Sequence, residues 1–118
     1  MAWSAVSSAT QLANITTEQF FTVTPQLTPG ETAHCVVDVD FPSTPTDNAI
    51  VSIYSTVDGT NWDDTAILAF SISNAIDPHQ MSFLIAGVYQ FRVGVKRSGT
   101  TDTITTADMD VRTNGIDA

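Results

Sequence analysis

The chain is poor in basic residues: it has four Lys and Arg against 13 Asp and Glu, which gives a formal net charge of −9 over 118 residues. This excess of negative charge repels the phosphates of nucleic acids and the headgroups of anionic membranes. The sequence therefore predicts no nucleic-acid partner and no membrane partner. The four bases all lie in the last quarter of the chain, at Arg92, Lys96, Arg97 and Arg112.

Cysteine and long apolar runs are also scarce. Cys35 is the single cysteine, so no disulfide can form within the chain, and we expect apolar packing and sheet hydrogen bonds to stabilise the fold. No apolar run approaches the roughly 18 residues that a membrane span needs, and the N-terminus lacks a positively charged segment followed by an apolar one. These absences predict a soluble chain without an export signal.

Groupings of residues that carry catalysis are missing as well. The only histidines are His34, in the outward phase of an alternating segment, and His79, which follows a proline. Cys35 falls in the inward phase, where a small buried thiol is expected rather than a reactive thiolate. No nucleophile, base and orienting group stand in a recognisable arrangement, so the sequence predicts no catalytic residues and no enzyme.

Metal and cofactor motifs are absent too. No Cys/His pair has the spacing of a zinc site, and no glycine-rich phosphate-binding loop occurs. Three aspartates surround one Asp-Gly turn, but their spacing is not that of a calcium loop, and turn formation in water explains them. They are Asp58, Asp63 and Asp64. We therefore expect no metal and no cofactor.

From about residue 15 onward, short runs rich in Val, Ile, Phe, Tyr and Thr alternate with clusters of Pro, Gly, Asp and Asn. This rhythm is typical of strands and turns, and no helical periodicity interrupts it. About seven strands with turns every 8 to 12 residues predict an all-β fold, an antiparallel β-sandwich over 15–118. The expected strands cover 18–24, 31–41, 49–57, 67–73, 80–85, 88–97 and 103–112.

The last two expected strands have the clearest alternation. The inward positions of the first are Tyr89, Phe91, Val93 and Val95. If 98–102 is a hairpin loop, Phe91 lies opposite Met109 and Arg92 lies opposite Asp108, which satisfies packing and charge together. The sequence therefore predicts that 88–97 and 103–112 pair as neighbours.

Residues 1–14 differ from the remainder, because they are mostly small and uncharged. Such a segment is expected to be an N-terminal arm that is ordered mainly by a partner. The large apolar side chains that would bind this partner are Trp3, Val6 and Leu12.

Two aromatic residues close to the Asp-Gly turn form a second candidate binding site. Trp62 follows the turn and Tyr54 precedes it, and exposed aromatic rings of this kind stack on sugars. The alternative, left open by the sequence, is that Trp62 closes the end of the core beneath its own turn.

Three stretches carry a family resemblance: 38–42 before a proline-rich loop, the 54–64 hairpin YSTVDGTNWDD, and 87–99, GVYQFRVGVKRSG. With these stretches the chain resembles the small immunoglobulin-like or fibronectin-like β-sandwich proteins on tailed-phage virions. Phe91 stands where antibody domains have a cysteine, so kinship with disulfide-linked immunoglobulins is not implied.

The resemblance implies a non-enzymatic virion protein. The favoured function is capsid decoration or cement, in which the arm and one sandwich face bind the major capsid protein or another virion protein. Such a protein would be made in the host cytoplasm and located on the capsid surface. The alternatives are a carbohydrate- or receptor-binding adhesion module, and a tail or neck component that forms homo-oligomers through a sheet edge in 18–24.

Overall fold

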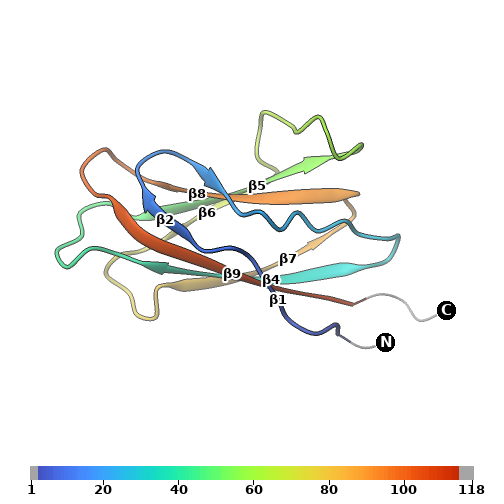
Figure 1. The fold of residues 1–118 in the computed structure, drawn as a ribbon, viewed down its shortest axis with the longest axis horizontal. Helices are drawn as coiled ribbons and strands as arrows, with labels where there is room; N and C mark the ends of the chain where they lie inside the picture. Colours follow the sequence, from blue (N-terminus) through green and yellow to red (C-terminus); the bar gives the residue numbers. More distant parts are fainter. Residues whose placement is uncertain (1–2, 115–118) are drawn as a thin grey trace.

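The computed structural model describes residues 3–114, which form two antiparallel β-sheets packed face to face (Figure 1). The all-β antiparallel sandwich predicted from the sequence is confirmed. Sheet A contains β1 (Ser7–Ser8), β2 (Leu12–Ile15), β4 (Thr32–Asp40), β7 (Gln80–Ala86) and β9 (Ile104–Asn114). Sheet B contains β3 (Gln19–Phe20), β5 (Ala49–Thr56), β6 (Leu68–Ile72) and β8 (Gln90–Arg97).

The chain crosses between the two sheets after almost every strand. Sheet A has the order β1–β9–β4–β7, with β2 also on β9, and sheet B has the order β3–β8–β5–β6. Among the described residues, β5 and β6 are the only consecutive strands that pair with each other, whereas β1 and β2 both pair with the same edge of β9. This alternation is the topology of a jelly roll. The strand order therefore differs from the immunoglobulin order that the sequence led us to expect.

The predicted pairing of 88–97 with 103–112 was wrong. In the structure β8 pairs with β5, and β9 pairs with β4, where Met109 lies opposite Val37. Phe91, Val93 and Val95 do point into the core, but Tyr89 precedes the strand and is 42% exposed. Alternation identifies the apolar face of a strand, and two strands that face the same core from opposite sheets satisfy it as well as a hairpin does.

The core lies between the two sheets and receives side chains from both. Sheet A contributes Val37 and Met109, sheet B contributes Val51 and Val93, and all four are almost fully buried. Phe21, just after β3, fills the space beside β8, where its backbone N–H donates to the Val93 carbonyl at 3.0 Å. Within residues 3–114 there is no helix long and apolar enough to cross a membrane.

The segment predicted to be an arm follows the edge of β9 in this structure. The backbone N–H of Ser4 donates to the Thr113 carbonyl at 2.7 Å, and that of Ala9 donates to the Met109 carbonyl at 2.9 Å. Further on, Leu12 lies opposite Ala107 and packs in the core. Binding of this segment to a partner stays a prediction.

Two loops at one end of the sandwich are joined by a reciprocal pair of aspartates. The Asp102 carboxylate accepts hydrogen bonds from the backbone N–H groups of Thr46 and Asp47, the latter at 2.7 Å. The Asp47 carboxylate in turn accepts from the N–H groups of Thr101 and Asp102, at 3.1 and 3.0 Å. The loop before β5 and the loop between β8 and β9 therefore hold each other in place, which joins sheet B to the strand that returns to sheet A.

Candidate interaction surfaces

The edge strands β6 and β7 lie on the same side of the sandwich, one in each sheet. The rings of Phe70 from β6 and Phe83 from β7 are 5.4 Å apart between their centroids. Beside them, a cavity of about 140 Å³ is lined by residues of both strands, among them Ile72 and Met81. We call this face, formed by β6, β7 and the 73–79 loop that connects them, the open side.

The open side is almost uncharged. Between residues 65 and 91 the only Asp, Glu, Lys or Arg is Asp77, although the whole chain contains 17 such residues, 13 acidic and four basic. Several large apolar side chains in this stretch are exposed: Ile67, Leu68, Ile76, Met81 and Leu84, the last at 63%. Edge strands that are not protected by charge or proline are ready to pair with another strand.

The register of β7 shows which backbone groups are available for such pairing. The Val39 N–H donates to the His79 carbonyl at 2.9 Å, so every second residue from His79 onward bonds to β4. The intervening residues, including Ser82 and Leu84, direct their N–H and C=O groups away from β4, where the described residues provide no further strand.

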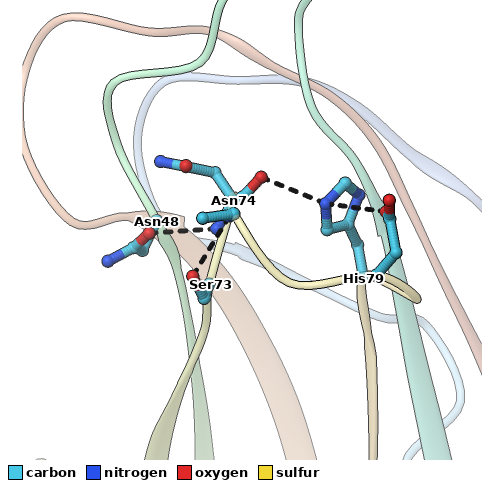
Figure 2. Close-up of polar contacts among 6 residues, drawn as sticks. Asn48, Ser73, Asn74 and His79 are labelled. Carbon is cyan, nitrogen blue, oxygen red and sulfur yellow. Dashed lines mark hydrogen bonds and ion pairs between the residues drawn. The ribbon is translucent and has the colours of Figure 1, made fainter.

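Polar contacts order the loop between β6 and β7 (Figure 2). The Asn74 N–H donates to the Asn48 side-chain oxygen at 3.1 Å, and the Ala75 N–H donates to the Ser73 hydroxyl at 3.1 Å. His79 Nε2 lies 3.1 Å from the Asn74 carbonyl oxygen and 3.2 Å from an Asp77 carboxylate oxygen. Because both neighbours are acceptors, Nε2 carries a proton. These contacts fix the relative positions of the two edge strands.

A second surface lies on the outer face of sheet B, around Arg92. Its guanidinium carbon is 3.8 Å from the ring centroid of Phe20, 4.9 Å from that of Trp62 and 5.7 Å from that of Tyr54. We call these four residues the Arg92 cluster. They come from β3, β5, β8 and the loop after β5, and all are half-buried.

Local structure explains why the rings gather there. Tyr54 and Arg92 are cross-strand partners, and Phe20 lies opposite Gly94, where the missing side chain leaves room for its ring. A Cβ atom on Gly94 would come within 2.9 Å of that ring. The Tyr54 hydroxyl donates to the Glu18 carboxylate at 3.1 Å, and partial burial together with the negative charge of Glu18 raises the pKa of Tyr54.

Arg92 has unused donors in this cluster. Among residues 3–114 it makes no hydrogen bond or ion pair, and its Nε atom is buried without a partner. Aromatic rings therefore hold the guanidinium in place through cation–π contacts alone.

The sequence-predicted site residues fall on two different surfaces. Tyr54 and Trp62 meet in the Arg92 cluster, and Trp62 does not belong to the core. Trp3 and Val6 lie beside β9 and are each 45% exposed, and the Trp3 ring contacts that of His34 at 5.9 Å. Sequence reasoning missed Phe20 and Arg92, because their proximity to Tyr54 depends on strand pairings that alternation does not specify.

The groups capable of nucleophilic or metal chemistry are engaged in structural contacts. Burial raises the pKa of the Cys35 thiol to about 12. The Asp58 carboxylate accepts from the Thr60 and Asn61 backbone N–H groups, each at 2.8 Å, and these bonds lower its pKa. Within residues 3–114 no group of three or more His, Cys, Asp and Glu side chains is arranged to hold a metal ion.

The outer face of sheet A is acidic. Asp38 on β4 lies directly opposite Asp108 on β9, and Asp40 and Asp110 extend the same face. Ser8 and Gln11 partly compensate this charge, because the Ser8 hydroxyl donates to Asp110 at 2.7 Å and the Gln11 amide donates to Asp108 at 3.2 Å. Like charges placed opposite each other repel, so this face is unsuited to contact with its own copy.

Comparisons with known proteins give one clear likeness. No family model matches the chain, and no curated protein sequence matches it. The fold is similar to a solved structure from Bacillus endospore appendages, which are described as a novel family of disulfide-linked pili. The TM-score is 0.61 at 15% sequence identity, and the match covers 98% of this chain and 88% of the other.

This likeness contradicts the phage interpretation. The prediction of a capsid decoration protein, bound to a major capsid protein on a virion surface, was wrong, because the fold is similar to that of a protein from Bacillus endospore appendages, which are pili. The stretches that carried the resemblance mark strands and turns, which unrelated sandwich proteins share. The fold of the chain is thus similar to that of a solved protein from Bacillus endospore appendages.

Proposed function

We propose that this chain is a non-catalytic structural subunit that associates with copies of itself to form a surface filament. The fold likeness to a pilus subunit supports the filament, and the open side supports self-association. This assignment replaces the capsid protein with a second copy of the chain as the main partner.

The uncharged edge strands of the open side are the main observation that supports self-association. An acidic protein that remained monomeric would be expected to place charge along its sheet edges, because edge strands otherwise pair with other chains. Here four acidic residues lie on the outer face of sheet A, at Asp38, Asp40, Asp108 and Asp110, whereas β6 and β7 have none. Pairing of β7 with an edge strand of another copy would continue a sheet from one subunit to the next and would cover Leu84 and its neighbours.

The link between subunits would be non-covalent in these 118 residues. The pili of the similar structure are disulfide-linked, whereas this chain has one cysteine, which is fully buried on β4. Backbone hydrogen bonds and apolar contacts along the edges would therefore hold the copies together.

The state of the titratable side chains supports a non-enzymatic role. His34 contacts the Trp3 ring, and His79 is hydrogen-bonded within its own loop. Neither histidine is hydrogen-bonded to a serine, threonine or cysteine side chain among the described residues, as a base that activates a nucleophile would be.

The test removes one free backbone donor from the edge. Ser82→Pro deletes an N–H that points away from β4, so the fold keeps its internal hydrogen bonds while the edge loses a pairing group. We expect the parent chain to form filaments visible by electron microscopy and the proline variant to stay monomeric by sedimentation velocity.

Ser82→Thr is the matched control, because it keeps the N–H and favours an extended strand. It should assemble as the parent does. Filaments of normal length from Ser82→Pro, with an unchanged unfolding midpoint, would show that β7 is not the contact. A parent chain that stays monomeric at high concentration would contradict self-association itself.

A further inference from the structure

The Arg92 cluster has the composition of a ligand-binding surface. Three aromatic rings surround a guanidinium whose N–H groups make no hydrogen bond within residues 3–114. An arginine with unused donors, flanked by half-exposed rings, presents apolar faces and hydrogen-bonding groups side by side.

The position of Trp62 argues for exposure to a ligand rather than for a purely structural role. It lies in the loop after β5 and contacts Arg92 on the outside of sheet B, instead of closing the core beneath its turn. Core stability does not account for a tryptophan in this place, because its ring is absent from the buried cluster between the sheets.

Carboxylates near the Arg92 cluster favour a neutral ligand over an anionic one. Glu18 accepts from the Tyr54 hydroxyl beside Arg92, and Asp63 accepts from the Ser55 hydroxyl in the same loop region. The Glu18 carboxylate offsets the positive charge of Arg92, and Asp63 adds negative charge to the loop that carries Trp62, so anionic ligands are disfavoured here. A neutral ligand that both donates and accepts hydrogen bonds, and that has an apolar face for stacking, fits this arrangement.

We propose that the outer face of sheet B binds a neutral sugar, whose pyranose ring stacks on Trp62 and whose hydroxyl groups bond to Arg92 and Glu18. Vicinal hydroxyls accept from the guanidinium fork, and a third hydroxyl donates to the carboxylate. The surface lies on a different sheet from β7, so sugar binding does not rest on self-association and a subunit in a filament could still present it.

The experiment measures sugar binding by the fluorescence of Trp62 alone. The chain has two tryptophans, so Trp3→Phe leaves Trp62 as the only indole reporter. A glycan array with neutral and acidic members identifies the ligand, and titration of the Trp3→Phe chain with the best neutral oligosaccharide gives its affinity. We expect saturable binding with a change in Trp62 emission.

Variants of the cluster then locate the site. Trp62→Ala, measured by calorimetry, should weaken binding by about tenfold, because the sugar ring loses both the stacking contact and the apolar surface that the indole covers. Arg92→Lys should weaken it too, since an ammonium lacks the fork. Trp3→Ala, on the other sheet, is the matched control and should bind as the parent does.

Three outcomes would overturn the proposal: no binding of any neutral glycan, binding confined to acidic glycans, or neutral-sugar affinity that survives Trp62→Ala. Thermal unfolding of each variant separates loss of the site from loss of the fold. Loss of sugar binding together with intact filaments, or the reverse, distinguishes this proposal from the one on self-association.

Discussion

At the scale of single residues, two aspartates hold two loops of the sandwich together. Asp47 and Asp102 are largely buried, and each carboxylate caps backbone N–H groups of the other's loop. Carboxylates that accept several N–H bonds are strong local anchors, because a buried donor left without an acceptor is costly. Neither aspartate was singled out in the sequence, since their proximity arises only when β8 and β5 pair.

We predict that Asp102→Ala lowers the free energy of unfolding by about 1–3 kcal/mol, because the Thr46 and Asp47 N–H groups lose their acceptor. Urea denaturation followed by circular dichroism measures the change. Asp108→Ala is the control: it removes an exposed carboxylate that faces Asp38, and it should leave stability unchanged or slightly raised. Equal effects of the two substitutions would contradict the anchoring role of Asp102.

Cys35 should be unreactive in the folded protein. Burial raises the pKa of its thiol from 9.0 to about 12, so the nucleophilic thiolate is scarce, and the side chain is fully covered. We expect an aromatic disulfide reagent at pH 8 to modify it only after urea unfolds the chain. Rapid modification without denaturant would contradict the buried position.

The same thiol makes stability depend on alkaline pH. In the unfolded chain it loses its proton near pH 9.0, whereas the folded chain retains it to about pH 12. The unfolded state then binds fewer protons, so the contribution of Cys35 is constant below pH 9 and is lost as the pH rises towards 12. Urea midpoints of the parent and Cys35→Ala at pH 7 and pH 10.5 test this, and the parent should lose more stability between the two values.

At the scale of elements, the sequence predicted strands well and partners poorly. The alternation in β4 and β8 placed Val37 and Val93 in the core correctly, and the Asp-Gly turn correctly marked the β5–β6 hairpin. The pairing of β8 with β9 failed, because both strands present apolar faces to one core from opposite sheets. The sequence indicated only two of the four residues of the Arg92 cluster. Tyr54 and Trp62 are close in sequence, whereas Phe20 and Arg92 reach them only through strand pairing, which the alternation does not specify.

The edge at 18–24 illustrates a similar limit. The sequence marked it as an unprotected edge, and β3 is an edge of sheet B, but only Gln19 and Phe20 form strand there and the Phe20 ring covers Gly94. The longer uncharged edge is β7, for which the sequence predicted a strand over 80–85 without indicating its position in the sheet. Periodicity shows that one face is buried, but it does not show whether a strand has one neighbour or two.

Gly94→Ala tests whether the space that Gly94 leaves for the Phe20 ring is needed for the pairing of β3 with β8. The added methyl group would meet the ring at 2.9 Å, so β3 should move away from β8 and the contact with Arg92 should weaken. We expect faster amide hydrogen exchange in residues 19–21 while exchange in β4 is unchanged. Unaltered exchange at 19–21 would mean that the ring adapts without moving its strand.

For the whole molecule, charge and assembly oppose each other. Each copy has a formal net charge of −9, and the acidic face of sheet A would be repeated along a filament. Salt screens this repulsion over about 10 Å at 0.1 M and leaves apolar contacts intact. The proposed self-association should therefore strengthen as the ionic strength rises, whereas an assembly held by ion pairs would weaken.

We predict that filament mass increases between about 10 mM and 150 mM sodium chloride, and that dithiothreitol has no effect on it. Light scattering during assembly measures both responses. Disassembly by the reductant would show that a disulfide links the copies despite the burial of Cys35. Weaker assembly at higher salt would show that ion pairs dominate the contact.

The pairing of Trp3 with Asn114, at the end of β9, brings the two ends of the described chain to one place on sheet A, where β4 separates β9 from β7. A passenger protein attached beside Trp3 or beside Asn114 would therefore lie at the same end of sheet A, with β4 between it and the proposed pairing edge of β7. By the same geometry, a short linker could join Trp3 to Asn114, and a circularly permuted chain opened in the 57–67 loop would retain every strand of both sheets.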